Sequence, residues 1–199
     1  MQTVTGLFDD YADARAAVTE MEQAGVPSEN ISIIANNVGG WHAGESHAVE
    51  GAGTGAAVGA VSGGTLGLLA GLGLMAIPGV GPVVAAGWLV ATLAGAAAGA
   101  VSIGAVGGII GGLIDAGVYE EDAHFYAEGI RRGGTLVIAR LLDEPMAYRV
   151  QAILGRASVD PAERRADYEQ TGWERFDETG RPWTNGEIDA ERDRLRPGS

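Results

Sequence analysis

The chain has 199 residues, a net charge of −13 and no cysteine, and its 13 basic residues are all arginine. The acidic balance disfavours the phosphate backbone of nucleic acids and anionic lipid headgroups, so we expect no nucleic-acid partner. The lack of cysteine excludes disulfide bonds, thiolate chemistry and cysteine-ligated metals. The first residues have neither a basic start nor an apolar run, so they do not resemble a secretory signal peptide.

The first 50 residues are predicted to form a strand–helix–strand unit. Residues 3–8 (TVTGLF) and 31–35 (ISIIA) have the apolar, β-branched composition typical of strands. Between them Asp10 is a good helix N-cap, and Gly25 is placed to end the helix. The apolar face of this helix consists of Ala14, Ala17, Val18 and Met21.

Residues 119–160 repeat this alternation. A helix is predicted before a Gly-Gly pair, and residues 135–142 (TLVIARLL) are the clearest strand of the chain. Asp143 is the expected N-cap of a second helix that ends at Gly155, and residues 157–159 are a candidate last strand. The apolar face of the first helix consists of Ala123, Tyr126, Ala127 and Ile130, and that of the second of Ala147, Val150, Ile153 and Leu154.

Neither unit can bury its sheet alone, so we expect the two to join. Residues 1–50 and 119–160 would then be the halves of one α+β domain of ferredoxin-like, split βαβ type, with a four-stranded sheet and helices on one face. Residues 51–118 would be an insertion whose two ends emerge close together. Residues 161–199 form a charged C-terminal tail.

Both flanks also resemble a known family. The stretches TVTGLFDDYADARAAVTEMEQAGVPSENISIIA and EEDAHFYAEGIRRGGTLVIARL look like the two halves of the YflT-like heat-induced general stress protein family. The resemblance covers about residues 3–36 and 119–159 and implies a role in stress response; it carries no catalytic motif. The long insertion departs from the shortest members and looks like the glycine-zipper segments of membrane-associated proteins.

The insertion is marked by regularly spaced glycines in a region without charge. Residues 51–114 contain no charged residue, and glycine falls at every fourth position from Gly51 to Gly71. Glycine costs an exposed helix about 1 kcal/mol against alanine, but a glycine stripe lets another backbone approach closely. We therefore expect self-association through the stripe. Its residues are Gly51, Gly55, Gly59, Gly63, Gly67, Gly71, Gly95, Gly99, Gly104, Gly108 and Gly112.

The same region is predicted to be a helical hairpin. Residues 77–82 (IPGVGP) are typical of a turn, and the arms 51–76 and 84–114 each exceed the about 20 residues that cross a bilayer. Two crossings would return the chain to its starting side, with the flanking domain in the cytoplasm and the lipid bilayer as a partner. The hydropathy is marginal for insertion.

Three classes of function remain open. The first is a non-enzymatic, stress-related protein that self-associates through the hairpin at a membrane. The second is a soluble, cytoplasmic homo-oligomeric scaffold or shell with the hairpin as its buried core. The third, a small-ligand sensor, has only the fold as support.

Other candidate sites are weaker, and we expect neither a cofactor nor a metal. His42, Glu45 and His47 could form a metal site, but a polar linker explains them equally well. Gly51, Gly53 and the glycine pairs near residues 107–112 match loose nucleotide-binding patterns, without the preceding strand and tight turn that such a site needs. His124 stands alone on its predicted helix and is expected to be solvated. No Ser/His/Asp set has supporting context.

The basic pair and the tail have competing interpretations. Arg131 and Arg132 could bind an anion, although the preference of helix C-termini for basic residues explains them more simply. Thr184 and Glu187 predict a capping box before a short helix. Trp173, Phe176 and Trp183 would either dock on the domain or form a recognition segment, and we favour docking.

Overall fold

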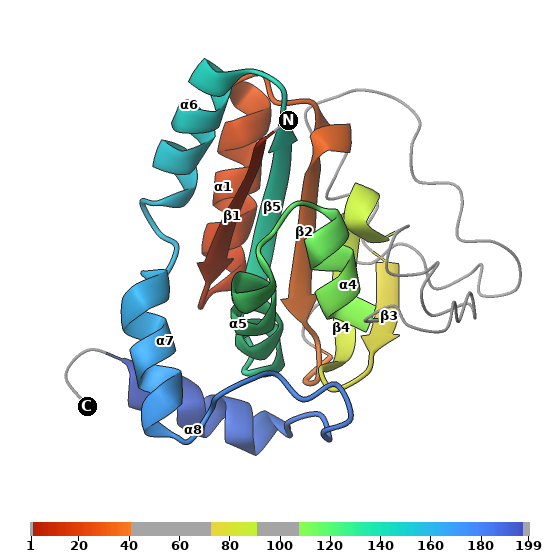
Figure 1. The fold of residues 1–199 in the computed structure, drawn as a ribbon, viewed down its shortest axis with the longest axis vertical. Helices are drawn as coiled ribbons and strands as arrows, with labels where there is room; N and C mark the ends of the chain where they lie inside the picture. The colour runs from red at the N-terminus through yellow and green to blue at the C-terminus, as the bar shows by residue number, and fades with distance from the viewer. Residues whose placement is uncertain (1, 41–72, 91–107, 197–199) are drawn as a thin grey trace, which may run out of the picture.

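A five-stranded antiparallel sheet is the centre of the fold (Figure 1). The computed structural model describes residues 2–40, 73–90 and 108–196. The strand order is β1-β5-β2-β4-β3, and every neighbouring pair is antiparallel. The strands are β1 (Gln2–Phe8), β2 (Ile31–Asn36), β3 (Gly73–Ile77), β4 (Gly81–Gly87) and β5 (Thr135–Leu141).

The two flanks meet in this sheet, which confirms the α+β class. β5 lies between β1 and β2, with Val137 opposite both Gly6 and Ile33. The prediction of four strands is wrong, because β3 and β4 extend the sheet beyond β2. The expected last strand at residues 157–159 is also absent from the described part, where Val159 donates one backbone hydrogen bond of 2.8 Å to Leu7 O.

One face of the sheet is covered by α1 (Tyr11–Gln23) and α6 (Glu144–Leu154), as predicted. The Asp143 carboxylate accepts from the backbone N–H of Met146 and so caps α6. Gly25 follows α1 with a φ of 97°, the conformation that favours glycine at this position. All eight residues expected on the apolar faces of these two helices are buried: Ala14, Ala17, Val18, Met21, Ala147, Val150, Ile153 and Leu154.

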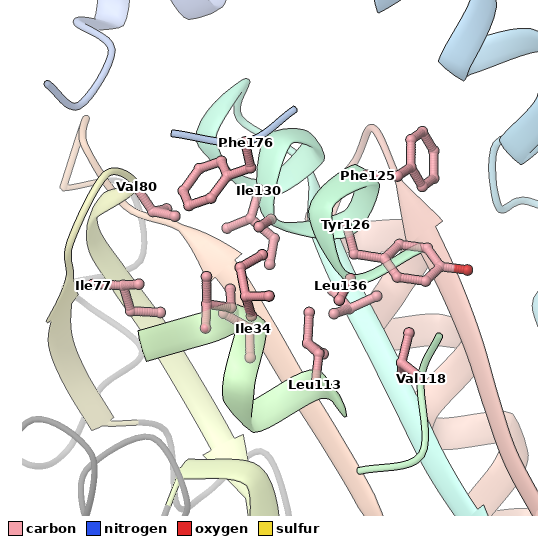
Figure 2. Close-up of a cluster of buried hydrophobic side chains, with 14 of the residues drawn as sticks. Ile34, Ile77, Val80, Leu113, Val118, Phe125, Tyr126, Ile130, Leu136 and Phe176 are labelled. Atoms are coloured by element: carbon pink, nitrogen blue, oxygen red, sulfur yellow. The ribbon is translucent and has the colours of Figure 1, made fainter. Parts of the chain in front are cut away.

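The opposite face is covered as well, so the expectation of helices on one face only is wrong. It carries α4 (Gly108–Asp115) and α5 (Glu120–Arg131), followed at its end by α7 (Pro161–Gln170) and α8 (Asn185–Leu195). Figure 2 shows the cluster that requires this cover: Ile34 and Leu136 of the sheet face Leu113 of α4 and Ile130 of α5. The sheet is apolar on both faces, and both must be removed from water. The buried cluster extends to Ile77 and Val80 of the β3–β4 hairpin and to Phe176 of the tail.

The insertion differs from its prediction. β3 and β4 lie where the two arms, 51–76 and 84–114, were expected to be helical, although residues 78–80 do form the expected turn. Val83 and Val84 explain the difference, because both are fully buried when β4 pairs with β2, an environment that favours β-branched residues. α4 agrees with the end of the second arm. Within the described ranges, no helix combines the length and apolarity needed to cross a membrane.

Candidate functional site

The predicted self-association glycines lie almost entirely outside the described residues. Only Gly108 and Gly112 are described, and both belong to α4, which packs against α5. Gly112 is buried, and a Cβ at Gly108 would lie 3.2 Å from Oε1 of Glu178. Both glycines thus lie in a helix packed within one chain, and the self-association role of all eleven stays a prediction.

The ranges that the structure describes, 2–40, 73–90 and 108–196, bring no set of candidate metal ligands together. No group of three or more His, Asp or Glu side chains in these ranges could hold a metal ion. His42, Glu45 and His47, the candidate ligands, lie outside them.

The tail contributes aromatic side chains to the buried cluster that also contains Phe125 and Ile130 of α5. Tyr168, Trp173 and Phe176 are all buried, which confirms the docking interpretation for the last two. The Tyr168 ring centroid lies 5.8 Å from that of Phe125 and 5.9 Å from that of Trp173. Such pairs add about 0.5–1.5 kcal/mol to the gain from burial. The tail is therefore part of the folded domain.

A buried arginine joins the tail to the end of α5. The Arg132 Nε lies 2.6 Å from Oε1 of Glu128, and its Nη1 lies 2.6 Å from Oε1 of Glu191 on α8. Its guanidinium carbon lies 4.2 Å from the ring centroid of Tyr168 and 4.9 Å from that of Trp183. We call these five residues the Arg132 cluster. The charge that could have bound an anion is thus neutralised within the fold.

Two members of the Arg132 cluster, Glu191 and Tyr168, have shifted pKa values. Burial alone would raise the pKa of Glu191, but hydrogen bonds from Arg194 and Arg132 outweigh it and hold this pKa below its usual value. Glu128 also faces Arg131, whose Nη2 lies 2.7 Å from Oε2 of the carboxylate. Burial raises the pKa of Tyr168 to about 12, so this ring stays neutral beside the cation.

An open hollow of about 500 Å³ lies beside the cluster. The arginines that line it already have carboxylate partners: Arg131 pairs with Glu128, and Arg175 pairs with Glu120 at 2.8 Å. The hollow therefore lies at the junction between tail and domain. Each arginine in its lining is already paired with a carboxylate, so none is free to bind an anionic ligand. The lining residues are Arg131, Arg132, Thr171, Gly172, Trp173, Glu174, Arg175, Trp183 and Glu191.

His124 is buried in α5, so the expectation of a solvated histidine is wrong. Its exposed fraction is 7%, and its Nε2 lies 3.9 Å from Oε1 of Glu120. Burial, assisted by the charge of Arg175, lowers the pKa of His124 below its usual value of 6.5, and Glu120 opposes this shift only in part. His124 is therefore neutral in the folded protein near neutral pH.

This burial predicts a loss of stability in mild acid. Between its lowered folded pKa and 6.5, the unfolded chain binds more protons at His124 than the folded one, so the free energy of unfolding falls as the pH falls. We expect the His124→Gln variant to lose less stability than the wild type between about pH 7.5 and about pH 5. Urea unfolding at several pH values measures the difference. Parallel pH profiles for the two proteins would contradict the assignment.

The outermost strand, β3, presents an apolar edge without charge. Its sequence is GLMAI, and its partner β4 (GPVVAAG) is also uncharged. Leu74 is 50% exposed, and Ala76 is exposed as well. Within the described chain, no strand pairs with the outer side of β3.

Sequence reasoning missed both the Arg132 cluster and the β3 edge. Glu128 and Arg132 have the i,i+4 spacing of a helical ion pair, which was available as a signal. Two apolar runs on either side of a Pro-Gly turn were available as a sign of a β-hairpin. No pattern of neighbouring residues in the sequence indicated that Arg132 contacts Glu191, which lies 59 positions away.

Comparison with known proteins adds no relative to this picture: no family model, curated protein or solved structure matches the chain. The resemblance to the general stress proteins therefore stays a prediction.

Proposed function

We propose that this protein is a non-enzymatic, stress-related protein that assembles into a homo-oligomer through its uncharged region, residues 51–114. The observation that carries this proposal is the β3 edge, where the region places an exposed, uncharged strand at the end of the described sheet in a chain of net charge −13. Acidic copies repel one another. The β3 edge is a described, uncharged surface over which two copies can approach without bringing carboxylates together.

The strand order supports a ferredoxin-like core. β1, β5 and β2 lie side by side, with α1 and α6 together on one face. Val159 reaches the outer side of β1, where a fourth strand of such a core would lie. β3, β4 and α4 are then an insertion that widens the sheet. The resemblance of the two flanks to the general stress proteins supports the role in stress response.

The path of the chain favours association between copies over a membrane hairpin. Residues 41–72 connect β2 to β3, and residues 91–107 connect the end of β4 to α4, so both ends of each connection are fixed in one domain. A connection of this kind must cross a bilayer an even number of times. Two crossings need about 40 residues, which is more than either connection has.

Leucine at Gly59 and Gly63 is expected to disrupt the oligomer. Both positions lie outside the described residues. Leucine raises helix propensity, so an isolated helix would gain stability, whereas a backbone packed against the stripe would be pushed away. We expect the double variant G59L/G63L to shift the mass distribution from the oligomer to smaller species in mass photometry.

The matched control is Gly186→Leu, because a Cβ at Gly186 meets no atom within 4 Å. This control is expected to keep the mass of the wild type. A monomeric wild type would contradict the proposed function. An oligomer that survives in G59L/G63L would contradict the proposed role of the glycine stripe in association.

A further inference from the structure

We infer that residues 176–182 of the tail are a latch that holds the β3–β4 hairpin and α4 on the domain, so that release of the latch loosens both. This latch loop lies between α7 and α8. The inference goes beyond the proposed function, because it concerns contacts within one chain and needs no second copy. It is carried by the fit of the loop against two segments of the insertion and by the sparse hydrogen bonding of the loop itself.

The latch loop lies directly on the turn between β3 and β4. A Cβ at Gly79 would lie 2.7 Å from the backbone oxygen of Asp177 and 3.0 Å from Cα of Glu178. A Cβ at Gly81 would lie 2.8 Å from Cβ of Pro182. These are backbone or ring atoms that cannot rotate away. The turn and the loop therefore fit together only because the turn has no side chain at either glycine.

Phe176 anchors the latch loop in the apolar core beside this turn. Its exposed fraction is 4%, and it belongs to the buried cluster that includes Ile77 and Val80 (Figure 2). The guanidinium carbon of Arg131 lies 5.4 Å from the ring centroid, so α5 also contacts the ring. Release of the loop would leave the end of the hairpin without the ring that helps to bury it.

The latch loop also reaches the first turn of α4. The Glu178 carboxylate accepts a hydrogen bond from the backbone of Ile110, and its Oε1 lies 3.2 Å from the place of a Cβ at Gly108. A carboxylate is stabilising near the N-terminus of a helix. One short loop thus holds two segments, the hairpin and α4, that residues 91–107 separate in the sequence.

The latch loop is expected to open more readily than the elements around it. Within the described chain, residues 176–182 make one backbone–backbone hydrogen bond, from Gly180 N–H to Asp177 O at 3.2 Å. Burial raises the pKa of Glu178, whose Oε1 has no hydrogen-bond partner among the described residues. Docking therefore has a desolvation cost. Segments with few backbone hydrogen bonds open locally without unfolding of the whole domain.

Alanine at Gly79 tests the latch by placing a methyl group between the turn and the loop. Trypsin cleaves after arginine, and the bond after Arg175 becomes accessible when the buried Phe176 leaves the core. We expect cleavage at this bond to be at least about tenfold faster in Gly79→Ala than in the wild type. The control is Gly25→Ala, because Gly25 also has a positive φ, 97° against 75° for Gly79, and a Cβ there meets no atom within 4 Å. It is expected to be cleaved like the wild type.

Alanine at Phe176 tests the coupling from the side of the tail. It removes the ring beside the turn, so we expect the amides of β3, β4 and α4 to exchange at least about tenfold faster. The amides of α1 and α6, on the opposite face of the sheet, are the internal reference and are expected to be unchanged. The matched control is Tyr148→Ala, which removes an aromatic ring that is 66% exposed on α6. It is expected to leave exchange in the hairpin at the wild-type rate.

Three results would overturn the latch. Equal cleavage of Gly79→Ala and Gly25→Ala would show that the turn does not hold the loop. Faster exchange in Phe176→Ala that is confined to the tail would show that the loop does not hold the hairpin. An equal rise at α1 and α6 would show unfolding of the whole domain in place of a local release. Neither experiment measures association, so a failure of the proposed oligomer leaves the latch in place.

Discussion

Replacing Arg132 by methionine is expected to lower the free energy of unfolding by about 3–5 kcal/mol, the range for breaking a buried ion pair. The substitution leaves Glu128, which is fully buried, with Arg131 as its remaining cation. It also removes the bond from α5 to Glu191 and the cation between the rings of Tyr168 and Trp183. Urea unfolding followed by tryptophan fluorescence measures the loss.

An exposed ion pair supplies the control. Arg156 pairs with Glu20 at the surface, where both side chains are about half exposed. Such pairs contribute about 0–1 kcal/mol, so Arg156→Met is expected to be nearly neutral. Equal effects of the two substitutions would show that the Arg132 cluster does not hold the tail. Limited proteolysis of Arg132→Met is expected to cut first within residues 161–196, because the tail loses its anchor.

Alanine at Gly87 is expected to cost about 2–5 kcal/mol. Gly87 has a φ of 98°, which disfavours any side chain, and a Cβ there would lie 2.2 Å from the backbone oxygen of Ile31. It would also lie 2.7 Å from Ser32 Cα. These are backbone atoms that cannot rotate away, so β4 must separate from β2. Denaturant unfolding measures the cost, and hydrogen exchange should show the amides of β4 losing protection first.

Gly73→Ala is the matched control in the same hairpin. The nearest atom to its Cβ would be the backbone oxygen of Ala85 at 3.9 Å, and its φ is not in the positive range. Alanine restricts the unfolded chain, so this variant is expected to be unchanged or more stable by up to about 1 kcal/mol. A destabilisation by Gly73→Ala as large as that by Gly87→Ala would contradict the steric explanation.

The elements that could be predicted from the sequence are those with local signals. Asp143 caps α6 and Gly25 ends α1, each recognised from residues within one helical turn. The capping box of Thr184 and Glu187 is present at the start of α8, as predicted. The buried faces of α1, α5 and α6 were also predictable, because helical spacing is a pattern within a short stretch of sequence.

The elements that were missed depend on contacts between distant residues. Glycine spacing in the uncharged region indicated helix, but Val83 and Val84 find burial by pairing with β2, which no short window reveals. The bond between Arg132 and Glu191 joins residues 59 positions apart. The Glu128–Arg132 pair was thus readable from the sequence as a helical ion pair, whereas the contact with Glu191 appears only when α8 docks.

The position of β5 has a consequence for the nascent chain. β1 and β2 pair with β5 but not with each other, and β5 begins only at Thr135. At synthesis rates of about 5–20 residues per second, the ribosome needs several seconds to extend the chain from β2 to β5. During that interval β1 and β2 lack their common neighbour, and the whole uncharged region has already been synthesised. The risk of premature contact between copies is therefore greatest before translation reaches β5.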